Sequence, residues 1–108
     1  MTTVVQTSRF TKKIARLLSA QEATLLAREL VDRPERGVVI QGTGGFRKHR
    51  FARDGGGRSG GLRIIYLYVV VRGVIFLVDA YAKNEKSDLT QREKKDLQTL
   101  ARQLRNEA

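Results

Sequence analysis

Two β-prone runs near the middle of the chain leave little freedom in how it folds. Residues 62–71 and 74–82 are dense in β-branched and aromatic side chains, which favour strands. Arg72 and Gly73 alone separate the two runs, and a tight turn of this length joins antiparallel strands. The sequence therefore predicts a β-hairpin inside an antiparallel sheet.

Two helices are predicted ahead of this hairpin. Apolar residues recur at the spacing of one helix face at Phe10, Ile14, Leu17 and Leu18. A second helix follows Ser19, because Ser19 and Glu22 form an S-x-x-E capping box. Pro34 and Gly37 end this helix. The two short neighbouring helices predict a helical hairpin.

The remaining elements complete an α+β pattern. Val4 and Val5 lie in a first short strand, and residues 46–51 alternate with the period of a strand. Thr90 and Glu93 form a second capping box, which opens a C-terminal helix running to about Arg105. The order β-α-α-β-β-β-α predicts one domain over residues 1–108. Its antiparallel sheet carries the helical hairpin on one face, and the opposite face is partly open to solvent.

The residue types exclude several classes of site. The chain has no cysteine and one histidine, which excludes disulfides, cysteine zinc sites and paired-histidine metal sites and argues against a Ser/His/Asp triad. We therefore expect neither a metal nor another cofactor. The longest apolar run, residues 64–71, is too short to span a membrane, and the N-terminus lacks a signal-peptide pattern. These features indicate a soluble, cytoplasmic protein.

Positive charge concentrates in the middle of the chain. The net charge is +10, and residues 41–72 carry seven Lys or Arg but one Asp. Eight of the ten glycines also lie within residues 42–66. Such a stretch attracts polyanions, chiefly nucleic acid, although an acidic protein segment would be attracted equally.

Strand alternation predicts which of these cations share a face. Val74, Phe76, Val78 and Ala80 are assigned to the core, so that Asp79 and Tyr81 point the other way. The face opposite the core then collects Lys48, Arg50, Arg63, Tyr81 and Lys83. Fixed cations around one spot suit a phosphodiester, whose charge grows in the transition state of backbone cleavage.

Simpler interpretations compete with this one. Lys48 and Arg50 can be solvated side chains of a half-exposed strand, and Asp79 can pair with a nearby base. His49 shares a face with Phe51, which favours a partly buried side chain over a general base. The glycines of residues 55–61 can form a flexible loop, or a loop that orders on nucleic acid with Arg53 and Arg58 on phosphates.

Four stretches together resemble the HigB branch of the RelE toxins. They are T-S-R-F-T-K-K-I at residues 7–14, G-T-G-G-F-R-K-H-R at 42–50, R-S-G-G-L-R-I-I-Y at 58–66 and Y-A-K-N-E-K-S-D-L-T at 81–90. The resemblance implies a compact RelE-like fold and ribosome-dependent cleavage of mRNA in the A site. The chemistry would be attack of a ribose 2′-hydroxyl on the adjacent phosphate, with no metal. The implied partners are a HigA-like helix-turn-helix antitoxin, and operator DNA through that antitoxin alone.

The resemblance also implies roles for individual residues. Arg63 lies where the family has a phosphate-binding arginine, and Lys48 and Arg50 supply cations for the RNA backbone or the transition state. In the segment at the end of the last strand, Tyr81 stacks on a base or shapes the site, and Glu85 is the acid placed to act as general base. Further phosphate contacts are assigned to Lys83, Lys86, Arg47, Arg53 and Arg58.

Two departures leave the proton-transfer groups open. No tyrosine follows Lys83, and Asn84 stands where some relatives carry a base.

Two other functions stay open. A ParE-like inhibitor would block DNA gyrase and leave mRNA intact, whereas a non-catalytic RNA- or ribosome-binding domain would bind with a steep salt dependence and no cleaved product.

Overall fold

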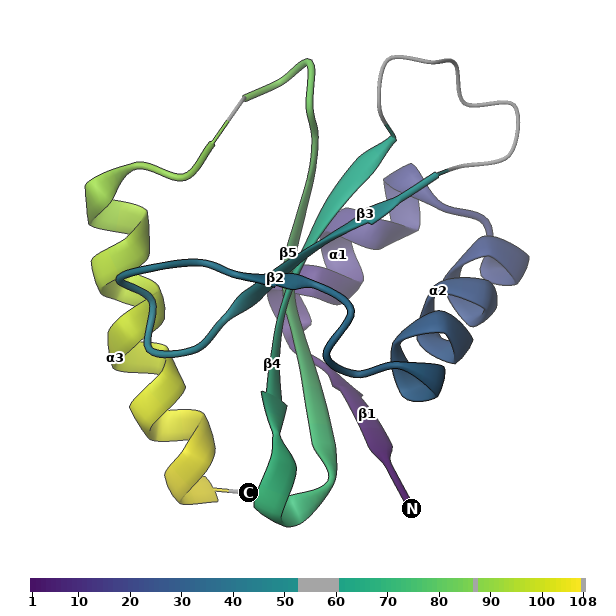
Figure 1. The fold of residues 1–108 in the computed structure, drawn as a ribbon. Helices are drawn as coiled ribbons and strands as arrows, with labels where there is room; N and C mark the ends of the chain where they lie inside the picture. Colours follow the sequence, from purple (N-terminus) through teal and green to yellow (C-terminus); the bar gives the residue numbers. More distant parts are fainter. Residues whose placement is uncertain (53–60, 87, 108) are drawn as a thin grey trace.

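The expected central hairpin is present in the computed structural model, which describes residues 1–52, 61–86 and 88–107 (Figure 1). Its strands are β4 (Leu62–Val69) and β5 (Val74–Ala82), and the 3-10 turn η1 (Val70–Arg72) joins them. Gly73 closes the turn at φ 64°, and a Cβ there would lie 2.9 Å from the carbonyl oxygen of Met1. Glycine is therefore the residue that fits this turn.

The hairpin lies inside a five-stranded sheet of order β1-β5-β4-β3-β2. Strand β3 (Arg47–Phe51) pairs antiparallel with β4, and a two-residue strand that was not predicted, β2 (Val38–Val39), pairs with β3. Strand β1 (Thr3–Gln6) pairs parallel with β5, so the sheet is mixed rather than wholly antiparallel. Parallel pairing needs a long connection, which most of the chain supplies here, so no local sequence signal reports it.

The predicted helical hairpin covers one face of the sheet. Helices α1 (Ser8–Leu17) and α2 (Ala20–Asp32) bury Phe10, Ile14 and Leu26 against β4 and β5. The first capping box forms as predicted, because Ser19 N donates to Glu22 Oε1 at 2.9 Å and Glu22 N donates to Ser19 Oγ at 3.1 Å.

Helix α3 (Gln91–Glu107) covers much of the opposite face, on the other side of the sheet in Figure 1. Ala101 and Leu104 of α3 pack there with Phe46, Ile65 and Phe76. The expectation of a partly open face therefore holds for one end of the sheet, where Lys48 and Arg63 are half-buried and Arg50 is exposed. Among the described helices, none is long and apolar enough to cross a membrane.

A β-bulge in β5 changes the predicted alternation. Ile65 pairs with Asp79, whereas the next residue, Tyr66, pairs with Leu77. The extra residue, Val78, faces α3 together with Val74 and Phe76, while Ala80 belongs to the core under α1 and α2. The four residues assigned to one core face are thus divided between two cores, because a bulge shifts the alternation by one residue.

Candidate nucleic-acid interface

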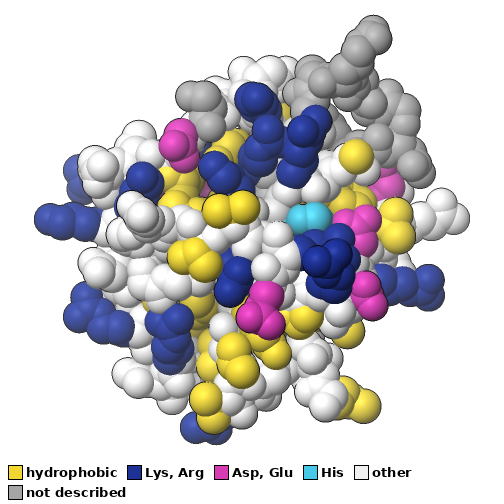
Figure 2. Space-filling view, in the orientation of Figure 1, with side chains coloured by type: hydrophobic (Ala, Val, Ile, Leu, Met, Phe, Trp, Pro, Cys, Tyr) yellow, Lys and Arg dark blue, Asp and Glu magenta, His cyan; other side chains and the backbone are white. Residues whose placement is uncertain are grey.

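Three cations gather at the end of the sheet that α3 leaves uncovered. In the register of the sheet, Arg50 lies opposite Arg63, and Arg63 lies opposite Tyr81. Lys48 lies opposite Ile65 on the same face, one step further along the strands. We call Lys48, Arg50 and Arg63 the cation row. Figure 2 shows Lys and Arg side chains clustered over this end of the molecule.

The cation row is an arrangement that favours an anion. Directly opposite residues of neighbouring strands lie about 5 Å apart, and like charges in such pairs destabilise a sheet. Arg50 and Arg63 form such a pair. An anion bound between them would relieve the repulsion, and a guanidinium can bind two phosphate oxygens at once.

Tyr81 lies beside the cation row but is buried. Its residue is 2% exposed, and its hydroxyl has no hydrogen-bond partner. Burial raises the pKa of this hydroxyl, and the charge of Asp88 adds to the rise. The ammonium of Lys86 lies 5.3 Å from the ring centroid. The ring is therefore already covered, which corrects the expectation that Tyr81 stacks on an RNA base.

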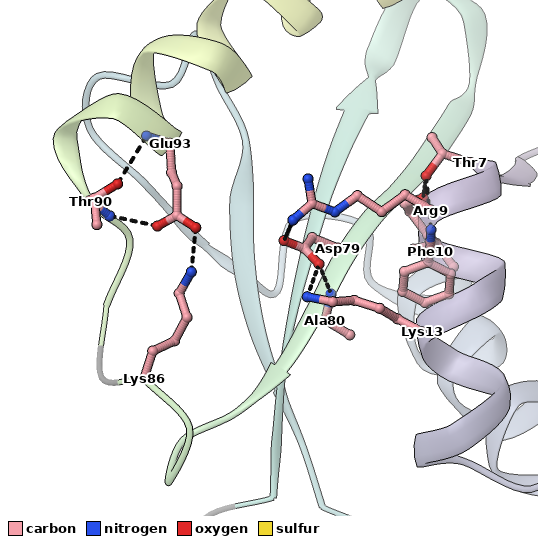
Figure 3. A network of polar contacts seen from close by, with 10 residues as sticks. Thr7, Arg9, Phe10, Lys13, Asp79, Ala80, Lys86, Thr90 and Glu93 are labelled. Atoms are coloured by element: carbon pink, nitrogen blue, oxygen red, sulfur yellow. Dashed lines mark hydrogen bonds and ion pairs between the residues drawn. The ribbon is translucent and has the colours of Figure 1, made fainter.

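Ion pairs hold Lys86 and Asp88, which follow β5, and Figure 3 shows the pair between Lys86 and Glu93. Lys86 Nζ contacts Glu93 Oε2, and Glu93 Oε1 accepts a hydrogen bond from Thr90 N at 2.8 Å. The hydrogen bond from Lys86 is the main cause that lowers the pKa of Glu93. Lys48 Nζ also lies 3.8 Å from Asp88 Oδ1. The cation row and the start of α3 are thus linked.

Glu85 does not join this group. Its Oε1 accepts a hydrogen bond from Ala82 N at 3.0 Å, and its side chain lines a hollow with Lys13, Arg16 and Ala80 on the α1 side of the sheet. This position argues against Glu85 as a general base at the cation row. Lys83 is exposed in the turn that follows β5.

Arg47 points away from the cation row, as the strand period requires for a neighbour of Lys48. Its Nη1 donates to the carbonyl oxygens of Glu35 at 3.0 Å and Gly37 at 2.8 Å. Its guanidinium thus holds the loop after α2, so the structure does not bring Arg47 to the cation row, and RNA binding by Arg47 stays a prediction. Arg53 and Arg58 lie outside the described residues.

Asp79 and His49 follow the simpler interpretations. Asp79 Oδ1 pairs with Lys13 at 2.8 Å and Oδ2 with Arg9 at 3.3 Å. His49 is buried, and its Nε2 lies 3.0 Å from Glu29 Oε1 of α2. Within the described ranges, no cluster of three or more His, Asp or Glu side chains could hold a metal ion.

Comparison with known proteins identifies the family. Residues 3–108 match the family described as the RelE toxin of the RelE / RelB toxin-antitoxin system. The chain belongs to the RelE toxin family. The match spans all the strands and helices described above.

A solved structure has the same RelE fold. The chain is similar to one in the crystal structure of the intact E. coli RelBE toxin-antitoxin complex, with a TM-score of 0.53 and 19% sequence identity. The similarity covers 74% of this chain and 94% of that one. At this identity the likeness concerns the fold alone.

Sequence reasoning missed two ion pairs of this RelE-family chain, one of Asp88 with Lys48 and one of Glu93 with Lys86. Asp88 reaches Lys48 across the sheet, and Glu93 was recognised for its role in the capping box alone. The one local signal for the second contact is the seven-residue spacing of Lys86 and Glu93 on either side of the helix start, which is too common to single out a site.

Proposed function

We propose that this RelE-family chain is a toxin of the HigB branch that cleaves mRNA in the ribosomal A site. The observation that carries the proposal is the cation row, with Arg50 and Arg63 directly opposite each other on neighbouring strands. The motifs at residues 42–50, 58–66 and 81–90 support the HigB assignment.

The proposed reaction needs stabilisation of charge more than it needs a cofactor. A ribose 2′-hydroxyl loses its proton and attacks the adjacent phosphorus, and the bond to the 5′-oxygen breaks as that oxygen takes up a proton. The products are a 2′,3′-cyclic phosphate and a free 5′-hydroxyl. Arg63 binds the phosphate, and Lys48 and Arg50 stabilise the added negative charge of the transition state. Lys83 and Lys86 hold neighbouring phosphates.

Tyr81 shapes this site from beneath rather than by stacking. Its buried hydroxyl lies near the charges of Arg63 and Asp88. Leaving a buried hydroxyl unpaired costs about 1–3 kcal/mol, so an unpaired hydroxyl at this place calls for an explanation, and a role in the site is one. We therefore keep Tyr81 in the proposed site as a residue that shapes it, and we leave Glu85 out of the site.

The partners follow from the same assignment. We propose a cognate helix-turn-helix antitoxin of the HigA type, which brings the complex to operator DNA, and a cytoplasmic location where ribosomes and mRNA are available. The excess of positive charge would speed association with an acidic antitoxin segment.

The decisive experiment is primer extension on a defined mRNA in a purified translation system, with and without ribosomes. We expect cuts at A-site codons that require ribosomes, and a loss of about 100- to 1,000-fold in cleavage rate for Arg63→Ala, the range for losing one transition-state donor. Arg72→Ala is the matched control, because Arg72 is exposed in η1, past the far end of β4.

Two results would reject the proposal. Equal loss in the Arg63 and Arg72 variants would show that charge in general matters and not the cation row. Intact mRNA under every condition would favour a gyrase inhibitor or a non-catalytic binding domain. Inhibition of gyrase in a supercoiling assay would then identify the ParE-like function.

A further inference from the structure

The second capping box holds a cation as well as a helix end. Glu93 N donates to Thr90 Oγ1 at 3.1 Å, and Glu93 Oε1 accepts from Thr90 N at 2.8 Å. These two bonds complete the box and fix the carboxylate at the start of α3. The other oxygen, Oε2, contacts Lys86 Nζ (Figure 3). One carboxylate therefore ties Lys86 to the helix.

The held ammonium lies at the edge of the cation row. Lys86 Nζ is 5.3 Å from the centre of the Tyr81 ring, and Tyr81 lies directly opposite Arg63. The side chains of Lys86 and Glu93 are each 32% exposed, so water and a ligand can reach the pair. A lysine ammonium has three donors, and the contact with Glu93 leaves others for a phosphate.

We infer that Glu93 is a positioning residue, which fixes the Lys86 ammonium for an RNA phosphate beside Arg63. A free lysine side chain is long and samples many rotamers, and ordering it on the RNA would cost binding entropy. Glu93 orders it before RNA arrives, with the helix cap as its anchor. The inference deepens the proposed function and rests on it.

A different role for Glu93, competition with RNA for Lys86, predicts a different effect of removing its charge. If its carboxylate merely competed with RNA for Lys86, removing the negative charge would strengthen RNA binding, since the phosphate backbone favours each added positive charge. If Glu93 positions Lys86, the cost of ordering the freed lysine outweighs that gain, so removing the charge weakens RNA binding and slows cleavage. The sign of the change therefore separates the two roles.

Glu93→Gln tests the inference while sparing the helix cap, because a glutamine amide oxygen can still accept from Thr90 N. We expect the rate of mRNA cleavage on ribosomes to fall about tenfold or more, given that a misplacement of about 1 Å can cost about 100-fold. The matched control is Glu22→Gln in the Ser19 box of α2. It should change the melting temperature as little as Glu93→Gln does and leave cleavage unchanged.

A double-mutant cycle with Lys86→Met tests whether Glu93 acts through Lys86. If it does, the double variant cleaves no more slowly than Lys86→Met alone, because both changes remove the same contact. Additive losses would overturn the inference, as would cleavage by Glu93→Gln at or above the wild-type rate. Equal losses in Glu93→Gln and Glu22→Gln would also overturn it, since they would reflect stability alone.

A binding assay distinguishes failure of this inference from failure of the proposed function. Affinity for a fluorescent single-stranded RNA is measured at low salt for the four proteins of the cycle. These are the wild type, Glu93→Gln, Lys86→Met and the double variant. Absence of ribosomal cleavage by the wild type would reject the proposed function. Weaker RNA binding by Glu93→Gln, non-additive with Lys86→Met, would still support the positioning role, and tighter binding would overturn it.

Discussion

His49 shows how a residue inside the basic segment can serve the fold. Its imidazole faces α2, where Glu29 contacts it and Arg36 adds a nearby positive charge. Burial is the largest influence and lowers the pKa of His49 below its ordinary value of 6.5, although Glu29 acts in the other direction. The folded protein therefore binds a proton here less readily than the unfolded chain.

The consequence is a loss of stability in mild acid. Above pH 6.5 neither state is protonated at His49, and its stabilising contribution is complete. As the pH falls below 6.5 the unfolded chain takes up the proton first, so the free energy of unfolding decreases. We expect His49→Gln to reduce the change in melting temperature between about pH 7.5 and 5.5. Cleavage of mRNA at pH 7.5 should be retained. An unchanged pH profile, or lost cleavage in a folded variant, would contradict this role.

At the same scale, side-chain direction could be predicted where strand alternation is regular. Lys48, Arg50 and Arg63 share a face as the alternation required. Arg47 was assigned to RNA by its charge, although the same alternation turns it toward the loop after α2. Glu85 lies in a turn, where a period of two no longer says which way a side chain points.

At the scale of elements, the glycines within residues 42–45 let α3 pack closely against the loop before β3. Gly44 has φ +77°, and a Cβ there would lie 3.1 Å from Ala101 Cβ. Gly42 has φ +82°, but its Cβ would meet Lys94 Cδ at 4.0 Å, which is an ordinary contact. Both positions have a positive φ, which would strain any residue with a Cβ, and they differ in how closely α3 approaches.

This pair provides a matched test. An alanine in the left-handed region costs about 1–2 kcal/mol, and we expect that loss in Gly42→Ala. Gly44→Ala should lose about 1 kcal/mol more, because α3 is pushed from the sheet. Urea unfolding followed by circular dichroism measures both. Equal losses would show that α3 adjusts without cost and that the close contact is unimportant.

The elements themselves were largely predictable, because their signals are local. Both capping boxes and the turn at Gly73 lie where the sequence placed them. The parallel pairing of β1 with β5 depends on strands distant in sequence, and the bulge at Val78 depends on how two cores share one strand. Neither has a short-range pattern. The same limit hid the contact between Asp88 and Lys48.

At the scale of the whole molecule, the question is whether net charge or the cation row binds RNA. A net charge of +10 attracts any polyanion. A defined site instead neutralises particular phosphates, and each one neutralised on a single strand contributes about −0.7 to the slope of log affinity against log salt concentration. The salt dependence therefore reports contacts at individual residues.

Two variants with the same net charge separate these possibilities. Arg50→Gln removes an exposed cation of the row, and Arg72→Gln removes an exposed cation in η1. We expect Arg50→Gln to reduce the steepness of the salt dependence for single-stranded RNA by about 0.7, and Arg72→Gln to leave it unchanged. Fluorescence anisotropy between 50 and 200 mM salt, the range over which such affinities fall steeply, measures both slopes. Equal reductions of the two slopes would mean that RNA responds to the overall charge. The cation row would then not be the binding site.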